Sequence, residues 1–317
     1  MSAPVLVELV RSGVVESVHR ASVLAVDPDG QPVLALGEVD VPVLPRSANK
    51  PLQAVGLLEA GWTPPDEQCL ALATASHSGE PPHLEVVLRT LAAAGLDASA
   101  LQCPAQLPLS EAAAHVLLRS GGEASRLTLN CSGKHAAMLA TAAASGQALE
   151  HYLDADAPVQ QALTAALERL AGEPVRHVAV DGCGAPQHAL TLTGLARAFT
   201  VLATGDGARA RTAAAMRARP DLVGGTGREV TDLMAGVPGL VAKDGAEGVF
   251  AAALPDGGAV AVKVSDGANR AAVPVLVAGL RALGAEADVL DRLARAPVLG
   301  GGAPVGELRP AGDLLRS

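Results

Sequence analysis

A serine and a lysine lie three residues apart in the segment Ser47-Ala48-Asn49-Lys50, at the expected start of a helix. At this spacing the two side chains lie on the same side of a helix, about one turn apart. A serine hydroxyl is a poor nucleophile until a base removes its proton, and a lysine with a lowered pKa can be that base. The pattern also suits a serine that caps a helix beside a surface lysine, and spacing alone does not separate the two interpretations.

A second lysine, Lys243, ends the apolar run of residues 239–242 and is followed by Asp244 and Gly245. A strand followed by K-x-G resembles the third motif of the penicillin-recognising serine enzymes, and here it comes after S-x-x-K, in the same order. A lysine before a turn is ordinary by itself. Together with the upstream motif, it indicates a cleft that both motifs face.

Lysine is scarce in this chain, which contains only Lys50, Lys134, Lys243 and Lys263. Arginine is the more frequent cation, and it does not deprotonate in proteins, whereas a desolvated lysine can act as a neutral base or ligand. We therefore interpret the remaining lysines as candidates for positions where arginine cannot substitute. Lys263 alternates with valines and is predicted on a solvated strand face.

Two cysteines lie in segments rich in functional residue types. Residues 130–135 (NCSGKH) precede a helical pattern and contain Cys131, and residues 181–184 (DGCG) follow a short apolar run and contain Cys183. Two thiolates suit a borderline cation such as Zn²⁺. The chain has no C-x-x-C pair, so two unrelated buried thiols remain the alternative.

A further hydroxyl, Ser76, lies in residues 75–80 (ASHSGE), between a predicted helix and two prolines. This segment suits a capping turn. It also suits a second serine in a cleft, and the sequence leaves both possibilities open.

The elements that must position these motifs follow from hydrophobic periodicity. The strands are predicted at residues 6–10, 22–26, 33–36, 240–243, 248–254 and 259–264. Helical patterns dominate between the two groups, and another helix is predicted at 268–283. This order predicts a mixed α/β fold, with a mixed sheet built from both chain ends and a helical insertion. We predict one domain over 1–317, with a sheet part at about 1–45 and 236–317 and a helical part at about 46–235.

Composition excludes several function classes. The 317 residues are 49% hydrophobic and 1% aromatic, with a formal net charge of −9. This charge argues against nucleic acid or an anionic membrane as a partner, and the few aromatic residues argue against base stacking. The sequence has no apolar run long enough for a transmembrane helix and no signal-peptide pattern, and its four cysteines are widely spaced. We expect a soluble, cytoplasmic protein.

Taken together, the motifs resemble the asparaginase II family, typified by the inducible rhizobial L-asparaginases. The segments that carry the resemblance are RSxxKP at 46–51, SHSGE at 76–80, NCSGKH at 130–135, DGC at 181–183 and KxG at 243–245. The resemblance covers essentially the whole chain, and NCSGKH is its most specific part. It implies the fold of the penicillin-recognising serine hydrolases (β-lactamase/glutaminase-like) and the hydrolysis of L-asparagine to L-aspartate and ammonia.

The resemblance also implies roles for individual residues. Two Ser–Lys tandems would be Ser47–Lys50 and Ser76–Lys243, and the family pattern does not settle which serine is the nucleophile. The other implied residues are Arg46, His135 and Asp181 for substrate binding, and Cys131, Lys134 and Cys183 for one zinc ion per chain. A homodimer is implied as well.

Two alternatives stay open. One is a broader serine amidase or glutaminase of the same fold, which differs only in substrate. The other is a catalytically silent amino-acid-binding module. The presence of both serines and both lysines argues against the silent module, because a binder has no need to keep two tandems.

Overall fold

The computed structural model describes residues 3–315, which form two compact units. Unit 1 consists of Met1–Ala48, Leu190–Thr204 and Asp232–Ser317, and unit 2 consists of Asn49–Ala189 and Gly205–Thr231. Unit 1 contains the main sheet, and unit 2 contains most of the helices. The S-x-x-K motif spans the point where the chain first passes from unit 1 to unit 2.

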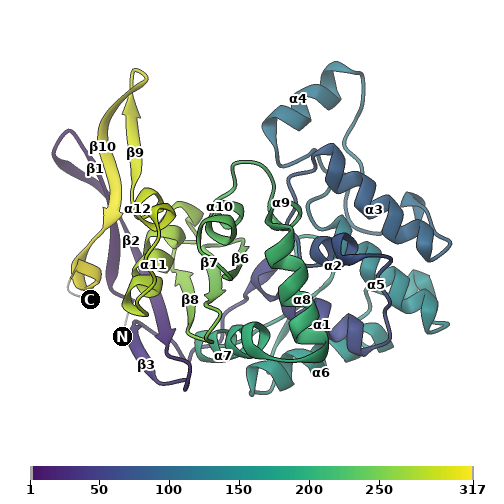
Figure 1. Ribbon diagram of the computed structural model, residues 1–317. Helices are drawn as coiled ribbons and strands as arrows, with labels where there is room; N and C mark the ends of the chain where they lie inside the picture. The colour runs from purple at the N-terminus through teal and green to yellow at the C-terminus, as the bar shows by residue number, and fades with distance from the viewer. Residues whose placement is uncertain (1–2, 316–317) are drawn as a thin grey trace. The chain divides into compact units, whose positions relative to one another are not determined.

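Unit 1 is built on one eight-stranded sheet with the order β6-β7-β8-β2-β1-β10-β9, in which β3 also pairs with β2 (Figure 1). Its strands are β1 Val5–Arg11, β2 Val14–Val26, β3 Pro32–Leu36, β6 Val241–Gly245, β7 Val249–Ala253, β8 Ala259–Val264, β9 Ala296–Gly300 and β10 Ala303–Pro310. Strand β1 pairs with β10, and β2 pairs with β8. This confirms that both ends of the chain contribute to the sheet.

The prediction of a mixed sheet is wrong, because every strand pairing within residues 3–315 is antiparallel. Short turns join β1 to β2, β6 to β7 and β7 to β8. Such short connections join only antiparallel neighbours, since a parallel pair needs a long crossover. The chain is therefore α/β in content, with an antiparallel sheet.

The sequence analysis missed the hairpin of β9 and β10. Its prolines and its run of glycines are typical of turns rather than strands. In the structure Gly300 pairs with Ala303, and the two residues between them, Gly301 and Gly302, have positive φ values of 59° and 85°. Two consecutive positive φ values are what a two-residue hairpin turn requires, so these glycines close the hairpin.

Helices cover the central strands of unit 1. They are α7 Leu192–Thr204, α11 Asn269–Ala282 and α12 Asp288–Leu293, while α10 Glu229–Gly236 lies across the last boundary between the units. Helices α7 and α11 both pack on β7 and β8. All of β7 is buried, and in β8 only Lys263 is half-buried. Both faces of this half of the sheet are therefore covered, although α7 falls within the range predicted for the helical part.

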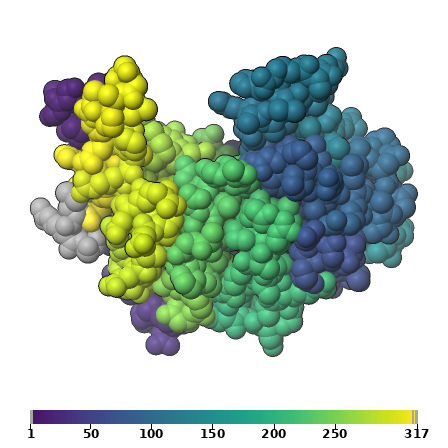
Figure 2. Space-filling view, turned by 45° about the horizontal axis from the view of Figure 1, so that its top comes forward, coloured from purple at the N-terminus to yellow at the C-terminus, as the bar shows by residue number. Residues whose placement is uncertain are grey.

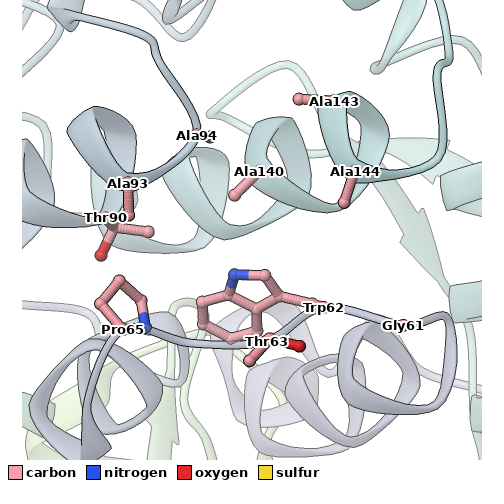
Figure 3. Close-up of a pocket in the computed structure, with 10 residues that line it drawn as sticks. All are labelled: Gly61, Trp62, Thr63, Pro65, Thr90, Ala93, Ala94, Ala140, Ala143 and Ala144. Atoms are coloured by element: carbon pink, nitrogen blue, oxygen red, sulfur yellow. The ribbon is translucent and has the colours of Figure 1, made fainter.

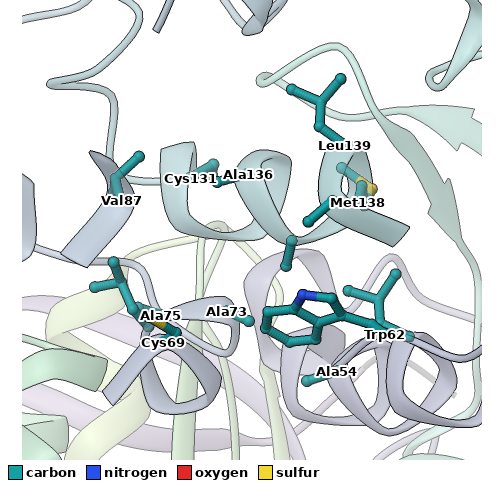
Figure 4. Packing of buried hydrophobic residues seen from close by; sticks show 14 of the residues in the cluster. Ala54, Trp62, Cys69, Ala73, Ala75, Val87, Cys131, Ala136, Met138 and Leu139 are labelled. Atoms are coloured by element: carbon teal, nitrogen blue, oxygen red, sulfur yellow. The ribbon is translucent and has the colours of Figure 1, made fainter. Parts of the chain in front are cut away.

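Unit 2 is helical and is organised around α5. Its helices are α1 Lys50–Glu59, α2 Glu67–Ala73, α3 Pro81–Ala93, α4 Glu111–Arg119, α5 Ser132–Ala144, α6 Pro158–Ala171, α8 Gly207–Ala218 and α9 Pro220–Val223. A small hairpin adds β4 Val178–Val180 and β5 Pro186–His188. Every residue of α5 from Ser132 to Ala142 is buried. Figure 4 shows its apolar side chains Ala136, Met138 and Leu139 in a core that also holds Trp62 and Val87.

Gly133 explains how α5 approaches α2 so closely. A Cβ atom at this position would lie 2.5 Å from the Leu72 carbonyl oxygen and 2.8 Å from its Cγ atom. Only glycine allows the two helices to meet at this distance without displacement. The first turn of α5, which contains the NCSGKH residues, is therefore fixed against α2.

Helix α4 is the least buried long helix of unit 2, with Ala114 as its one buried residue. Its side chains Val116 and Leu118 are exposed, and the helix stands away from the rest of unit 2 in both views (Figures 1 and 2). Within residues 3–315, no helix has the length and apolar character needed to cross a membrane.

Candidate active site

In unit 1 the serine of S-x-x-K lies in a segment that packs against the end of β6. A Cβ atom on Gly245 would lie 2.4 Å from the Pro45 carbonyl oxygen and 3.2 Å from the Ala48 amide nitrogen. The K-x-G motif therefore has glycine at its third position because the backbone of residues 45–48 occupies the space of a side chain. Lys243 lies two residues before Gly245 on the same strand, so its side chain leaves the sheet on the same face.

Arg46 and Ser47 begin the short 3-10 helix η1 Arg46–Asn49. Arg46 has a φ of 54°, one of only a few positive values among the non-glycine residues 3–315. An arginine in this left-handed region is strained, and such strain persists where surrounding structure enforces it, often at functional sites. The strain turns the chain sharply just before Ser47.

Lys243 is fully buried, and its Nζ atom donates a hydrogen bond of 2.7 Å to the Asp244 carbonyl oxygen. The Asp244 carboxylate also forms an ion pair with this amine. Burying an amine without hydrogen-bond partners would be costly, so these two acceptors explain how the Lys243 amine can be buried. The structure thus places Arg46, Ser47 and Lys243 in one part of unit 1.

In unit 2 the other predicted residues gather in a buried group that we call the lysine–thiol cluster: Lys50, Ser76, Cys131, Lys134 and Cys183. The Lys50 Nζ atom lies 2.5 Å from the Ala75 carbonyl oxygen, 3.2 Å from Ser76 Oγ and 3.1 Å from Cys131 Sγ. This contact pairs the lysine of the first predicted tandem with the serine of the second.

Backbone hydrogen bonds on both sides fix the position of Ser76. Its amide donates to the Val223 carbonyl oxygen at 3.1 Å, and its carbonyl accepts from Arg228 Nη1 at 3.3 Å. The next amide, of His77, donates to the Asn130 carbonyl oxygen at 3.1 Å. The serine is therefore held between the start of α5 and the segment that follows α9.

The two thiols of the cluster interact with each other. Hydrogen bonding between their side chains raises the pKa of Cys131 and lowers that of Cys183. The Lys134 amine lies 3.3 Å from Cys183 Sγ. Burial acts to lower the pKa of Lys134, but the charges of Cys183 and Cys131 outweigh burial and raise it. A thiolate and an ammonium ion thus stabilise each other here.

His135 and Asp181 surround Cys183. The Tyr152 hydroxyl lies 2.7 Å from His135 Nδ1 and accepts a hydrogen bond from the Gln102 amide. Cys183 Sγ lies 3.7 Å from Asp181 Oδ2. Asp181 therefore contacts Cys183 of the lysine–thiol cluster, and His135 contacts Tyr152.

The donor atoms of the cluster suit a zinc ion. No group of three or more His, Cys, Asp or Glu side chains among residues 3–315 is arranged to hold a metal, so a site here needs the Lys134 amine as its third protein ligand. Two thiolates would balance the charge of Zn²⁺, and sulfur with nitrogen is a donor set that this ion accepts. His135 Nε2 is buried beside them and has no hydrogen-bond partner, which adds an unsatisfied polar atom at this place.

Two cavities of unit 2 have linings of a different kind. One, of about 290 Å³, lies beside Trp62 (Figure 3) and is lined by small apolar residues and two threonines, without an acid, a base or a thiol. The other, of about 630 Å³, lies under α4 and is mainly apolar, with Glu80 as its one ionisable residue. Neither lining includes a residue of the lysine–thiol cluster.

The sequence analysis missed Tyr152 and Ser132, which contact the site residues His135 and His77. Tyr152 carried a usable signal, because it is the only tyrosine in the chain. Its rarity marks it as a candidate functional residue in the same way as the rarity of lysine marks the lysines. Ser132 carried no comparable signal, since a serine at the start of a helix is common.

We expect Gly245→Ala to destabilise the protein, because the new methyl group would collide with the Pro45 carbonyl oxygen. Overpacking of this kind costs about 1–3 kcal/mol, which thermal unfolding would show as a lower Tm. Gly258→Ala is the matched control, since its nearest neighbours lie at an ordinary 3.4 Å. Equal Tm values for the two variants would contradict the close packing of residues 45–48 on β6.

We expect the free energy of unfolding to decrease at acid pH because of His188. Burial, followed by the charge of Lys134, lowers the pKa of His188 to about 4 from 6.5. Because the unfolded chain then binds a proton that the folded chain does not, stability falls as the pH drops from about 6.5 to about 4, by up to about 1.4 kcal/mol per pH unit. His188→Gln should flatten this part of the denaturation profile, and an unchanged slope would contradict the assignment.

Comparison with known proteins identifies the family. Residues 7–310 match the family model described as L-asparaginase II. No curated protein sequence matches the chain. The family match spans nearly the whole described chain and includes both units. The chain therefore belongs to the L-asparaginase II family, whose members are amide hydrolases.

Proposed function

We propose that this protein hydrolyses the side-chain amide of L-asparagine, giving L-aspartate and ammonia through a serine acyl-enzyme. The observation that carries the proposal is the contact between the fully buried Lys50 amine and Ser76 Oγ at 3.2 Å. An amine within hydrogen-bond reach of a serine hydroxyl is the arrangement needed for proton transfer to or from it. The family supplies the substrate class.

The hydrogen bonds of Lys50 suggest how proton transfer would work. An ammonium has three N–H donors, which matches its three acceptors: Ala75 O, Cys131 Sγ and Ser76 Oγ. A neutral amine has two N–H bonds and a lone pair, so one contact must reverse. The Ala75 carbonyl only accepts, so we propose that the lone pair of the neutral amine replaces the N–H bond toward Ser76 or Cys131 and is then available to take a serine proton.

In the proposed reaction, neutral Lys50 takes the proton of Ser47, and Ser47 attacks the amide carbon. Ser76, coupled to Lys243, passes this proton from Lys50 to the ammonia that leaves as the C–N bond breaks. Water then attacks the aspartyl ester, its hydroxyl completes the aspartate carboxyl group, and its proton passes through Lys50 back to Ser47. The exchanged assignment, in which Ser76 is the nucleophile and Lys50 its base, is supported by the same 3.2 Å contact.

For substrate binding we propose Arg46, His135 and Asp181. The guanidinium of Arg46 suits the α-carboxylate of an amino acid, because its planar fork matches a carboxylate. His135 is fully buried, and its Nε2 atom has no hydrogen-bond partner within residues 3–315, so it would contact the substrate through Nε2. A homodimer and a cytoplasmic location stay predictions of the resemblance.

We also propose that Cys131, Lys134 and Cys183 hold one zinc ion per chain. When bound, such an ion would supply a fixed positive charge that organises the surrounding polar groups. Lys134 would have to lose its proton to act as a ligand, and Cys131 its thiol proton.

The decisive test is ammonia release by the purified protein with L-asparagine, beside L-glutamine and a blank. We expect ammonia release from asparagine well above that from glutamine. Ser47→Ala and Ser76→Ala should each lower turnover by about 10³-fold or more. Lys50→Arg should do the same, because arginine cannot act as a base.

Lys263→Arg is the matched control, since Lys263 lies on β8 and outside the motifs, and it should keep near-normal activity. Trapping the acyl-enzyme and mapping the modified peptide would identify the nucleophile as Ser47 or Ser76. Near-full activity in either serine variant would contradict the tandem mechanism. No ammonia from either amide would contradict the proposed function.

Elemental analysis tests the metal site directly. After dialysis with zinc and removal of the excess, the protein should retain one zinc per chain, whereas Cys131→Ala and Cys183→Ala should retain almost none. Cys69→Ala removes another buried thiol that lies outside the cluster, and it should retain the full amount. One zinc per chain in Cys131→Ala would refute the site.

A further inference from the structure

The residue after Ser76 makes a chain of hydrogen bonds that the proposed reaction does not use. His77 is fully buried, and its Nδ1 atom accepts a hydrogen bond of 3.1 Å from the Gly79 amide. Its other nitrogen, Nε2, lies 2.9 Å from Ser132 Oγ. Ser132 in turn donates to the Leu127 carbonyl oxygen at 2.8 Å. The imidazole thus joins the loop after Ser76 to the first residue of α5.

Every donor and acceptor in this chain has only one possible direction. The Gly79 amide must donate, so Nδ1 has no proton and Nε2 has it. The Leu127 carbonyl must accept, so the Ser132 hydroxyl donates to it and accepts from His77 Nε2. Burial, with the nearby charges of His83 and Lys50, holds the pKa of His77 well below 6.5. His77 is therefore a neutral connector in a single tautomer.

A second histidine holds the other end of the same loop. His83 stacks on His77 with ring centroids 5.3 Å apart. It accepts a hydrogen bond from the Glu80 amide on Nδ1 and donates from Nε2 to the Asp221 carbonyl oxygen at 2.9 Å. The loop from Ser76 to Glu80 is thus held from two sides by neutral imidazoles.

We propose that His77 and Ser132 are positioning residues that fix Ser76 against Lys50. This inference rests on the proposed function, because it assigns a purpose to the Ser76–Lys50 contact. Helix α5 begins at Ser132 and continues through Lys134, so the His77–Ser132 bond ties the serine loop to the helix that bears part of the lysine–thiol cluster. The Ser76–Lys50 distance of 3.2 Å is already at the long end for proton transfer, so a small shift breaks the contact.

Two isosteric variants separate the two bonds of His77. In His77→Gln the amide nitrogen can occupy the place of Nε2 and still donate to Ser132. In His77→Asn the amide oxygen can occupy the place of Nδ1 and still accept from Gly79, but the bond to Ser132 is lost. We expect His77→Asn to lower kcat by about 10²-fold with little change in KM, because misplacement by about 1 Å has this effect. His77→Gln should recover most of the activity.

Ser132→Ala removes the other partner and should match His77→Asn in kcat. The double variant should be no worse than either single variant, since both remove one interaction. Equal losses in His77→Gln and His77→Asn, or additive losses in the double variant, would overturn the proposal.

Amide hydrogen exchange keeps the test independent of turnover. In His77→Asn and Ser132→Ala, peptides that contain residues 74–80 should exchange faster, because the loop that holds the Ser76 and His77 amides against the Val223 and Asn130 carbonyl oxygens loses its link to α5. Peptides from α6 should not change. Unchanged exchange at 74–80 would overturn the proposal even in an active enzyme. Faster exchange in a protein without amidase activity would support the link and reject the proposed function instead.

Discussion

The buried amine of Lys50 is the constraint on which the arrangement of unit 2 depends. A lysine with almost no exposed surface is tolerated only if its amine has partners, and three residues from two segments provide them: Ala75, Ser76 and Cys131. The loop after α2 and the start of α5 must therefore meet at the first residue of α1. Moving any of the three would leave the amine or an acceptor unsatisfied in the interior, which costs more than an ordinary surface contact.

Small residues let the surrounding segments approach one another closely enough to provide partners for the Lys50 amine. Gly133 lets the first turn of α5 reach the Leu72 carbonyl oxygen, which brings Cys131 and the residues after α2 to the same place. In unit 1, Gly245 does the same for the segment that contains Ser47. The glycines of the NCSGKH and K-x-G motifs are thus explained by close backbone approach, and the functional side chains beside them depend on that approach.

The sequence predicted much of this site but not its internal connections. Lysine scarcity selected Lys50, Lys134 and Lys243, all of which are buried, because rarity reflects chemistry that arginine cannot replace. Strand direction was predicted incorrectly, since periodicity fixes which residues face a core but not how distant strands pair. The contact between Lys50 and Ser76 could not be predicted from the sequence either, because it depends on how helices α1, α2 and α5 pack together.

The hydrogen bonds of the buried histidines favour the proposal that lysines, rather than histidines, exchange protons with a serine. His77 and His83 each accept from a backbone amide on Nδ1, and each donates from Nε2 to a fixed acceptor. A histidine with both nitrogens engaged in this way has no free lone pair to act as a base. His135 has its Nδ1 engaged by Tyr152, and burial lowers its pKa. The buried imidazoles of His77 and His83 thus serve as neutral connectors, which supports the proposal that the amines of Lys50 and Lys243 exchange protons with a serine.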